Sequence, residues 1–180
     1  MSMKKVVVFI LVTCLTTHLK AQNRDITSAG DIIQIALPAA ALTTAFIYDD
    51  DGTKPVKQFI FAYGSGFILQ QSLKHLVQKP RPDGSNNYSF PSGHTTCAFT
   101  GAAFIQRRYG WKYGAPCYLL ASFVGYSRIQ AKKHDGWDVL AGATIGIGTN
   151  YIFTKPYQKK VQVGFINDQN GYQLGLTYTF

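Results

Sequence analysis

Long apolar segments, each ended by a cluster of polar residues, run through most of the chain and predict helices. The predicted helices cover residues 31–48, 57–78, 94–109, 115–130 and 137–153. Their apolar parts of about 14–17 residues have a length between that of a buried bundle helix and that of a membrane span. Small residues are frequent near the third and fifth segments, which favours close helix packing in water or in lipid. The pattern therefore predicts an all-α fold, a bundle of about five helices.

The last part of the chain changes to an alternation of apolar and polar residues, which is typical of strands. Residues 160–166 and 172–180 alternate in this way, and Asn170-Gly171 between them is a strong turn signal. The sequence therefore predicts a short C-terminal β-hairpin over residues 157–180, after a helical domain over residues 27–156.

A targeting segment is predicted at the N-terminus. Two lysines precede the apolar run 6–15, and the small residue Ala21 follows it. This order is typical of a signal peptide, here over residues 1–21, and the apolar run is shorter than the roughly 20 residues that cross a bilayer. We therefore expect export from the cytoplasm followed by cleavage, and a retained membrane anchor is the alternative.

Composition places the chain near a membrane. Hydrophobic residues make up 46% and charged residues 15% of the sequence, which excludes a disordered chain. The charged share is below the roughly one quarter that is usual in soluble domains. All nine acidic residues are Asp, so any mechanism that needs a catalytic Glu is excluded.

The formal net charge of +9 is compatible with nucleic acid, anionic lipid headgroups or phosphate-bearing substrates. There is no dense run of basic residues, and the aromatic residues lie in apolar runs instead of among the basic ones. Since nucleic-acid sites combine basic and aromatic residues, we expect no nucleic-acid partner.

Three clusters of polar residues lie beside predicted helix ends. They are Lys74-x6-Arg81-Pro82, Pro91-Ser92-Gly93-His94 and Ser127-Arg128-x5-His134-x3-Asp138. Each alone has an ordinary structural interpretation: solvated charges at a helix end, a helix start, and an i,i+4 pair on a helix surface. Taken together, the clusters supply what the hydrolysis of a phosphoester without a metal requires.

The first requirement is a site for the phosphoryl oxygens. Lys74, Arg81 and Arg128 provide three positive charges. Ser92 and Gly93 lie where a helix should begin, and backbone N–H groups at a helix N-terminus are donors for a phosphate.

The second requirement is a nucleophile with acid–base support. A neutral imidazole can attack phosphorus to give a phosphohistidine, and a carboxylate can hold its other ring nitrogen, as Asp138 can do for His134. His94 is the remaining candidate for the group that protonates the leaving oxygen and later activates water.

The three motifs, in this order, resemble the tripartite signature of the type 2 phosphatidic acid phosphatase and vanadium haloperoxidase superfamily, over about residues 57–153. The resemblance implies a helical bundle whose active site lies where three helix ends converge. It implies His134 as the nucleophile, Asp138 as its partner and His94 as the acid/base. The implied phosphate ligands are Lys74, Arg81, Ser92, Gly93 and Arg128.

The resemblance also implies a hydrolase acting on phosphoric ester bonds, with no metal and no cofactor. We expect a phosphomonoester or diphosphate substrate, of a lipid such as phosphatidate, an isoprenoid or lipid A. Three alternatives stay open: a soluble periplasmic non-specific acid phosphatase, a vanadium haloperoxidase that binds vanadate, and a catalytically idle phosphate-binding envelope protein. Intact His134, His94 and Asp138 argue against the idle binder, which needs only the cations.

Location in the cell envelope is expected in every one of these interpretations, either at the membrane or in the periplasm. Membrane members of the family resemble bundles of six spans, a number reached here only if the leader is retained. Many basic residues lie at the predicted helix ends opposite the three clusters, which favours a cytoplasmic location for that side and a periplasmic active site. They are Lys54, Lys57, Arg107, Arg108, Lys112, Lys155, Lys159 and Lys160.

Overall fold

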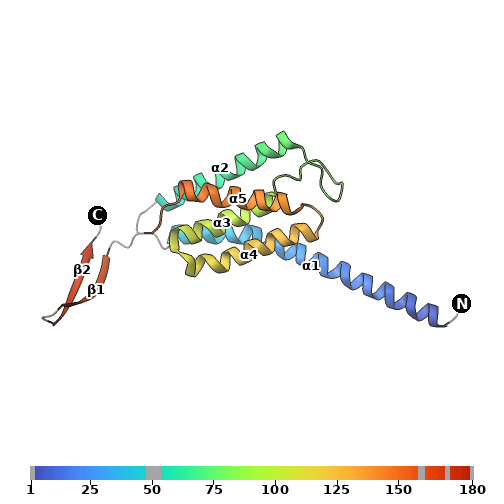
Figure 1. Cartoon of the computed structure of the whole chain (residues 1–180), viewed down its shortest axis with the longest axis horizontal. Coiled ribbons are helices and arrows are strands. Elements are labelled where there is room, and N and C mark those ends of the chain that lie inside the picture. The colour runs from blue at the N-terminus through green and yellow to red at the C-terminus, as the bar shows by residue number, and fades with distance from the viewer. Residues whose placement is uncertain (1–2, 48–53, 158–160, 169–170, 179–180) are drawn as a thin grey trace.

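The computed structural model describes residues 3–47, 54–157, 161–168 and 171–178. In these ranges the chain forms a bundle of five helices that lie side by side (Figure 1). The helices are α1 (Met3–Ile47), α2 (Lys54–Val77), α3 (Gly93–Tyr109), α4 (Trp111–Gln130) and α5 (Gly136–Phe153). The prediction of an all-α helical bundle is therefore confirmed.

Helix α3 is the centre of the bundle and contacts each of the other four helices. Two apolar clusters form the core: Leu37, Ala98, Ala102, Ala121 and Val124 in the first, and Ala41, Ala45, Phe59, Phe104 and Ile105 in the second. Half of these residues are alanines, so the helix axes can approach closely.

Glycines bring the backbone of α3 close to those of α1 and α5. A Cβ atom added to Gly101 would lie 2.6 Å from the carbonyl carbon of Leu37 in α1. A Cβ atom added to Gly142 of α5 would lie 2.6 Å from the carbonyl oxygen of Ser92, and one added to Gly146 would lie 2.7 Å from that of Thr96. These contacts leave no room for a side chain, so they fix the distances between α3, α1 and α5.

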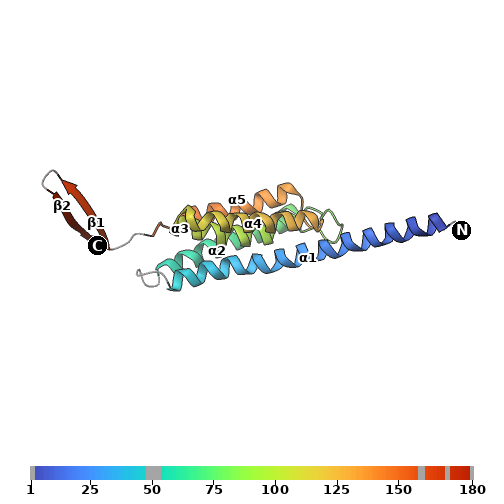
Figure 2. The ribbon, with the colours of Figure 1, turned by 90° about the horizontal axis from the view of Figure 1, so that it is seen from below.

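The first helix differs from its predicted bounds. The apolar pattern predicted a start at residue 31, whereas α1 begins at Met3 and extends well beyond the bundle (Figure 2). The intervening residues 22–30 contain no proline, and their single glycine is insufficient to end a helix. The helix therefore continues through the predicted cleavage point at Ala21, and the signal peptide over residues 1–21 stays a prediction.

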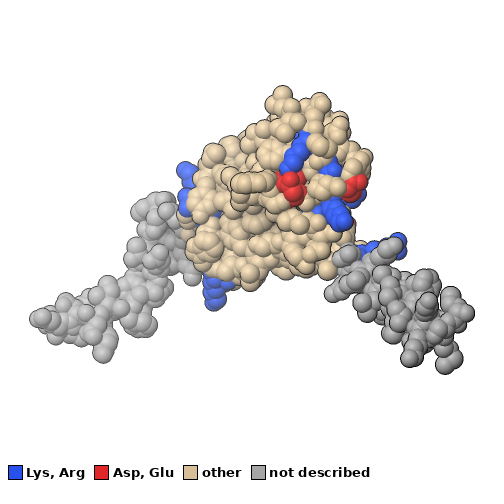
Figure 3. All heavy atoms as spheres, turned by 45° about the vertical axis from the view of Figure 1, so that its right-hand side comes forward, with Lys and Arg blue, Asp and Glu red and all other residues tan. Residues whose placement is uncertain are grey.

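Large apolar side chains are exposed on the outer faces of α1, α2, α4 and α5, which surround α3; among them are Ile35, Ile68, Leu76, Leu119 and Ile152. Charged side chains gather towards the ends of the bundle on the face seen in Figure 3, and an uncharged band separates them. In the described part of the chain one helix, over Arg24–Ile47, is long and apolar enough to cross a membrane by length and composition.

Two strands follow the bundle. β1 (Val161–Asp168) pairs antiparallel with β2 (Gly171–Tyr178), with Val161 opposite Tyr178. Among the residues that the structure describes, these strands contact each other and no helix.

Candidate active site

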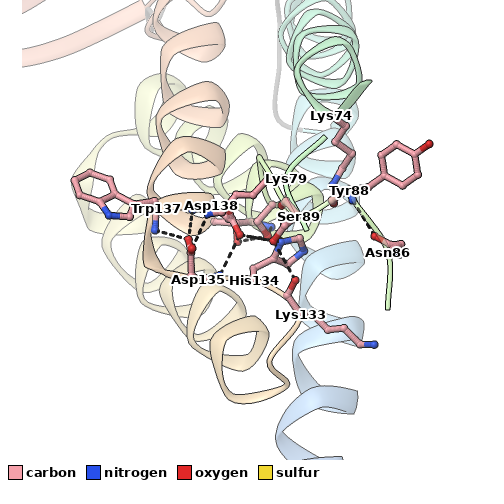
Figure 4. Close-up of polar contacts among 12 residues, drawn as sticks. Lys74, Lys79, Asn86, Tyr88, Ser89, Lys133, His134, Asp135, Trp137 and Asp138 are labelled. Carbon is pink, nitrogen blue, oxygen red and sulfur yellow. Dashed lines mark hydrogen bonds and ion pairs between the residues drawn. The ribbon is translucent and has the colours of Figure 1, made fainter. Parts of the chain in front are cut away.

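The three sequence clusters meet at one end of the bundle. Lys74 lies in the last turn of α2, and Arg81 lies in the loop that follows. Ser92, Gly93 and His94 begin α3, and Arg128 lies in the last turn of α4. His134 and Asp138 flank the start of α5. Figure 4 shows Lys74, His134 and Asp138 converging from α2, the α4–α5 loop and α5.

The tautomer of His134 is fixed by the main chain. Its imidazole is buried, and Nδ1 lies 2.7 Å from the carbonyl oxygen of Ser89. Because a carbonyl oxygen can only accept, Nδ1 must carry the proton. Nε2 then carries the lone pair, which is the requirement for a nucleophile.

The hydrogen bond to Ser89 modifies the expected role of Asp138. We predicted that the Asp138 carboxylate would hold His134 directly, but Oδ2 of Asp138 lies 3.7 Å from Nδ1, at ion-pair distance only. The physical reason is that other donors already occupy this carboxylate. It accepts hydrogen bonds from Ser89 Oγ at 2.5 Å, from Lys79 Nζ at 2.8 Å and from the backbone N–H of Asp135 at 3.0 Å.

Asp138 also belongs to the helix cap of α5. The Asp135 side chain accepts from the backbone N–H of Asp138, and the Asp138 side chain accepts from the backbone N–H of Asp135. This reciprocal capping box satisfies donors that an isolated helix start leaves unpaired. The same interactions fix the position of the Asp138 carboxylate beside His134, so the fold of the helix start positions the site.

Burial and charge favour the neutral imidazole. Burial lowers the pKa of His134 from its ordinary value to about 4, and the nearby cations Lys74 and Arg81 act in the same direction. At neutral pH His134 is therefore uncharged and available as a nucleophile.

Two of the predicted phosphate ligands come from α2 and the loop after it. Lys74 Nζ donates to the carbonyl oxygen of Tyr88 at 2.8 Å. In the described part of the chain, Nε of Arg81 is buried and has no hydrogen-bond partner. A buried N–H without an acceptor costs free energy, so this guanidinium suits an anionic ligand.

The start of α3 contributes backbone donors. Ser92 is the N-cap residue, and its backbone N–H donates to the carbonyl oxygen of Asp138 at 2.9 Å. The next N–H groups, of Gly93 and His94, belong to the first helical turn, where no intrahelical acceptor exists. A Cβ atom on Gly93 would lie 3.3 Å from Nε2 of the buried Gln70, so a larger residue here would press on α2.

The remaining predicted residues, His94 and Arg128, share a partner that the sequence analysis missed. The Asp31 carboxylate on α1 lies 3.0 Å from His94 Nε2 and 2.9 Å from Arg128 Nη1. Lys79 and Ser89, which hold Asp138, were also missed. The spacing of Asp135 and Asp138, which is the pattern of a capping box, signals the start of α5 but gives no indication of Asp31, Lys79 or Ser89.

No group of three His, Cys, Asp or Glu side chains in the described ranges is arranged to hold a metal ion. The described residues of the site are cations, helix-start N–H groups, two histidines and the carboxylates that contact them. Such a set can bind a phosphate and support nucleophilic attack on it.

Similar proteins carry related names. The chain is 43% identical over 77 residues to the lipid A 1-phosphatase of Porphyromonas gingivalis, a match that covers 41% of this chain and 17% of that protein. It is 39% identical over 80 residues to the lipid A 4'-phosphatase of Helicobacter pylori, with 44% of this chain and 40% of that protein covered. The chain thus spans less than half the length of either curated relative.

Structural similarity extends further along the chain. The crystal structure of Aquifex aeolicus LpxE superposes with a TM-score of 0.63 at 30% sequence identity, covering 73% of this chain and 84% of that one. A family model described as the PAP2 superfamily matches residues 55–162, which include all three motifs. With more than half of its length matched and the fold shared, the chain belongs to the PAP2 superfamily.

Proposed function

We propose that the protein is a phosphatase that hydrolyses the phosphate ester of a membrane lipid through a phosphohistidine at His134. One observation carries the proposal: Nδ1 of the buried His134 is tied to the Ser89 carbonyl, which leaves the Nε2 lone pair free beside Lys74 and Arg81. The names of the relatives, which are phosphatases of lipid A, support the same reaction.

In the proposed reaction, Lys74, Arg81, Arg128 and the N–H groups at the start of α3 bind the phosphoryl oxygens. Nε2 of His134 attacks phosphorus, and the bond from phosphorus to the ester oxygen breaks. His94 gives its proton to that leaving oxygen. The negatively charged Asp138 stabilises the cationic phosphoimidazole.

The second half of the reaction returns the enzyme to its starting state. His94, now neutral, takes a proton from water as the water oxygen attacks the phosphohistidine. The bond from phosphorus to Nε2 breaks, and inorganic phosphate leaves. Both histidines then have their original protonation.

A lipid substrate is supported by the outer surface of the bundle. A soluble protein rarely exposes large apolar side chains on all of its outer helices, as α1, α2, α4 and α5 do here, whereas a lipid-facing bundle does so. A small pocket between α2 and α3, lined by Tyr63, Phe67, Cys97 and Gly93 among others, lies next to the start of α3. We propose that it contacts the part of the lipid next to the phosphate, and that the substrate is a lipid A-type phosphate.

We further propose that the bundle lies in a membrane of the cell envelope, with the site on the periplasmic side. The basic residues at the opposite end, which include Arg107, Arg108 and Lys112, support a cytoplasmic location for that end. Residues 1–21 would direct export. We propose residues 27–156 as the phosphatase domain and residues 157–180 as a separate hairpin, which the pairing of β1 with β2 supports.

The function is tested with the full-length protein in mild detergent. Phosphate release is measured from bisphosphorylated lipid A, phosphatidate and p-nitrophenyl phosphate, each with EDTA or with vanadate. We expect release from lipid A that resists EDTA, is inhibited by vanadate and falls at least about a thousandfold in His134→Ala. Lys132→Ala, an exposed lysine in the same loop, is the matched control and should retain full activity.

Each part of the proposal has an outcome that would contradict it. Full activity of His134→Ala would refute the phosphohistidine. Release from p-nitrophenyl phosphate in the absence of detergent, with none from either lipid, would favour a soluble acid phosphatase. Turnover of bromide and peroxide with vanadate, and no phosphate release, would favour a haloperoxidase.

A further inference from the structure

Asp31 connects the first helix to the candidate active site. A single oxygen of its carboxylate, Oδ1, lies 3.0 Å from Nε2 of His94 and 2.9 Å from Nη1 of Arg128. His94 comes from α3 and Arg128 from α4, so one side chain of α1 joins two other helices. Asp31 lies before residue 55, where the match to the PAP2 superfamily begins, and none of the three motifs includes it.

The position of α1 along α4 is fixed at this point. Gly30 packs directly against the Ser127 side chain, and a Cβ atom on Gly30 would overlap with it. The carbonyl oxygen of Thr27, one turn earlier, accepts a hydrogen bond from Arg128 Nη2 at 3.0 Å. A shift of α1 by one residue would break both contacts, so the location of Asp31 is determined by packing.

Arg128 is held on three sides by these contacts. The Arg128 side chain is 6% exposed. Its Nε donates to Ser127 Oγ at 3.2 Å, and Nη1 and Nη2 contact Asp31 and Thr27. A guanidinium held in this way is oriented before a ligand arrives. Preorganised donors stabilise charge that develops in a transition state more effectively than mobile ones.

His94 is surrounded by charges of both signs. The cations Arg128 and Arg81 act on its imidazole, and Asp31 is the carboxylate that opposes them. A carboxylate can only accept, so Nε2 carries the proton in this pair, and Nδ1 is the ring nitrogen left to serve the substrate. The carboxylate favours a second proton on this imidazole and so opposes the guanidinium groups, which disfavour it.

We propose that Asp31 is a positioning residue that orients His94 as the proton donor to the leaving oxygen and holds the Arg128 guanidinium towards the phosphate. The proposal rests on the proposed function. It places part of the active site in α1, so the motif helices alone do not complete the site.

The test compares leaving groups in the full-length enzyme. Dioctanoyl phosphatidate has an alkoxide leaving group that needs a proton, whereas the nitrophenolate of p-nitrophenyl phosphate leaves without one. In Asp31→Asn we expect kcat/KM for phosphatidate to fall about 10- to 100-fold more than kcat/KM for p-nitrophenyl phosphate. We also expect the alkaline limb of the phosphatidate pH profile to move to lower pH. Asp31→Glu should recover part of the loss.

The matched control is Asp25→Asn. Asp25 is an exposed carboxylate earlier on α1, and its replacement should leave both substrates unaffected. Equal losses with the two substrates in Asp31→Asn, or no loss, would overturn the proposal. A faster enzyme that binds vanadate more tightly would also overturn it, because Asp31 would then compete with the phosphate for Arg128.

A second measurement does not depend on activity. Nitrogen-15 NMR of the imidazoles, assigned with His94→Gln, reports which ring nitrogen of His94 carries the proton. We expect protonated Nε2 in the unmodified protein and a mixture of tautomers in Asp31→Asn. An unchanged tautomer would overturn the proposal even in an active enzyme. If neither substrate is hydrolysed while the tautomer shifts, the proposed function fails and the pairing of Asp31 with His94 stands.

Discussion

At the residue scale, the two histidines of the site are held by different kinds of partner. His134 is tied to a main-chain carbonyl, that of Ser89, whereas His94 contacts a side-chain carboxylate, that of Asp31. A hydrogen bond to a neutral carbonyl fixes the tautomer of an imidazole and favours its protonated form less than a carboxylate does, because the carbonyl carries no full charge. The partners thus match the proposed division of labour between a neutral nucleophile and a proton donor.

The pKa of His134 leads to a prediction that NMR can check. Its pKa is lowered to about 4, so between pH 4 and 6.5 the unfolded chain binds more protons than the folded one. The free energy of unfolding should therefore fall as the pH drops from 6.5 to 4, by up to about 3 kcal/mol from this group. A titration of the imidazole, assigned with His134→Gln, should have its midpoint near pH 4. A midpoint near 6.5 would contradict the prediction.

A second prediction concerns Asp138, whose carboxylate is buried among three donors. Asp138→Asn keeps the volume but removes the charge that stabilises a cationic His134. We expect kcat to fall about 100- to 10,000-fold, while the Kd for vanadate changes only a few-fold. Asp83→Asn, in an exposed ion pair with Lys133, is the control and should stay within about threefold of the unmodified enzyme. An unchanged kcat in Asp138→Asn would remove Asp138 from the mechanism.

The sequence predicted which residues gather at the site but not all of the contacts between them. Residue types and spacing pointed to His134, His94 and Asp138. They could not predict the contact of His134 with the Ser89 carbonyl, because every residue has a backbone carbonyl and the sequence does not distinguish one from another. Asp31 could not be found either, since a single Asp at the edge of an apolar segment is typical of a helix start and gains its meaning only from packing.

At the element scale, glycines determine how closely the helices approach one another. Gly142 lets α5 lie against the carbonyl oxygen of Ser92, the N-cap residue of α3. That carbonyl accepts hydrogen bonds from the backbone and side chain of Thr96, within the first turn of α3. A displacement of α5 at this point would therefore disturb the N–H groups proposed to bind phosphate.

Alanine substitutions at two glycines of α5 distinguish the effect of close packing on stability from the effect of helix propensity. Gly142→Ala should lower the free energy of unfolding by about 1–3 kcal/mol, because its Cβ would lie 2.6 Å from the Ser92 oxygen. Phosphatase activity should fall with it. Gly148→Ala, on the same helix with nothing within 4 Å, should be neutral or stabilise by about 0.5–1 kcal/mol. Thermal unfolding in detergent measures both, and equal effects would contradict the prediction.

Helix bounds were predictable where polar residues end an apolar segment. Proline, glycine and charged clusters mark the ends of α2 to α5 to within a few residues. The start of α1 was not predictable in this way, because residues 22–30 are polar but compatible with a helix. Polar residues interrupt the apolar face of a helix but do not end the helix itself. A helix ends at a residue that disfavours the helical backbone conformation or that satisfies the free carbonyl groups of the last turn.

At the scale of the whole molecule, the outer surface combines an uncharged band with charged ends (Figure 3). Such a surface is typical of a protein that lies in a bilayer, where charges are costly in the hydrocarbon and favourable at the interface. The low charged share of the sequence pointed in the same direction, but composition alone could not show that the charges gather at the ends.

Two lysine substitutions on α2 test this placement. Ile68 and Leu76 are both well exposed, at 67% and 79%, but Ile68 lies in the interior of α2 and Leu76 lies in its last turn. In a bilayer, Ile68→Lys should cost about 2–3 kcal/mol and reduce the amount of folded protein in the membrane fraction, whereas Leu76→Lys should cost little. In water both substitutions would be tolerated, so equal and small effects would contradict the membrane placement.

The three motifs meet at one end of the bundle, and this location has a consequence for selectivity. Helix α5 has 18 residues and is about 27 Å long, close to the thickness of the hydrocarbon core of a bilayer. In the proposed orientation the cations and both histidines are therefore held at one height, level with the lipid headgroups. The enzyme would therefore select substrates by the depth of their phosphate in the bilayer. A phosphate held well above or below the depth of the site, on a long, flexible or deeply buried headgroup, would not reach it, whatever the acyl chains of the lipid.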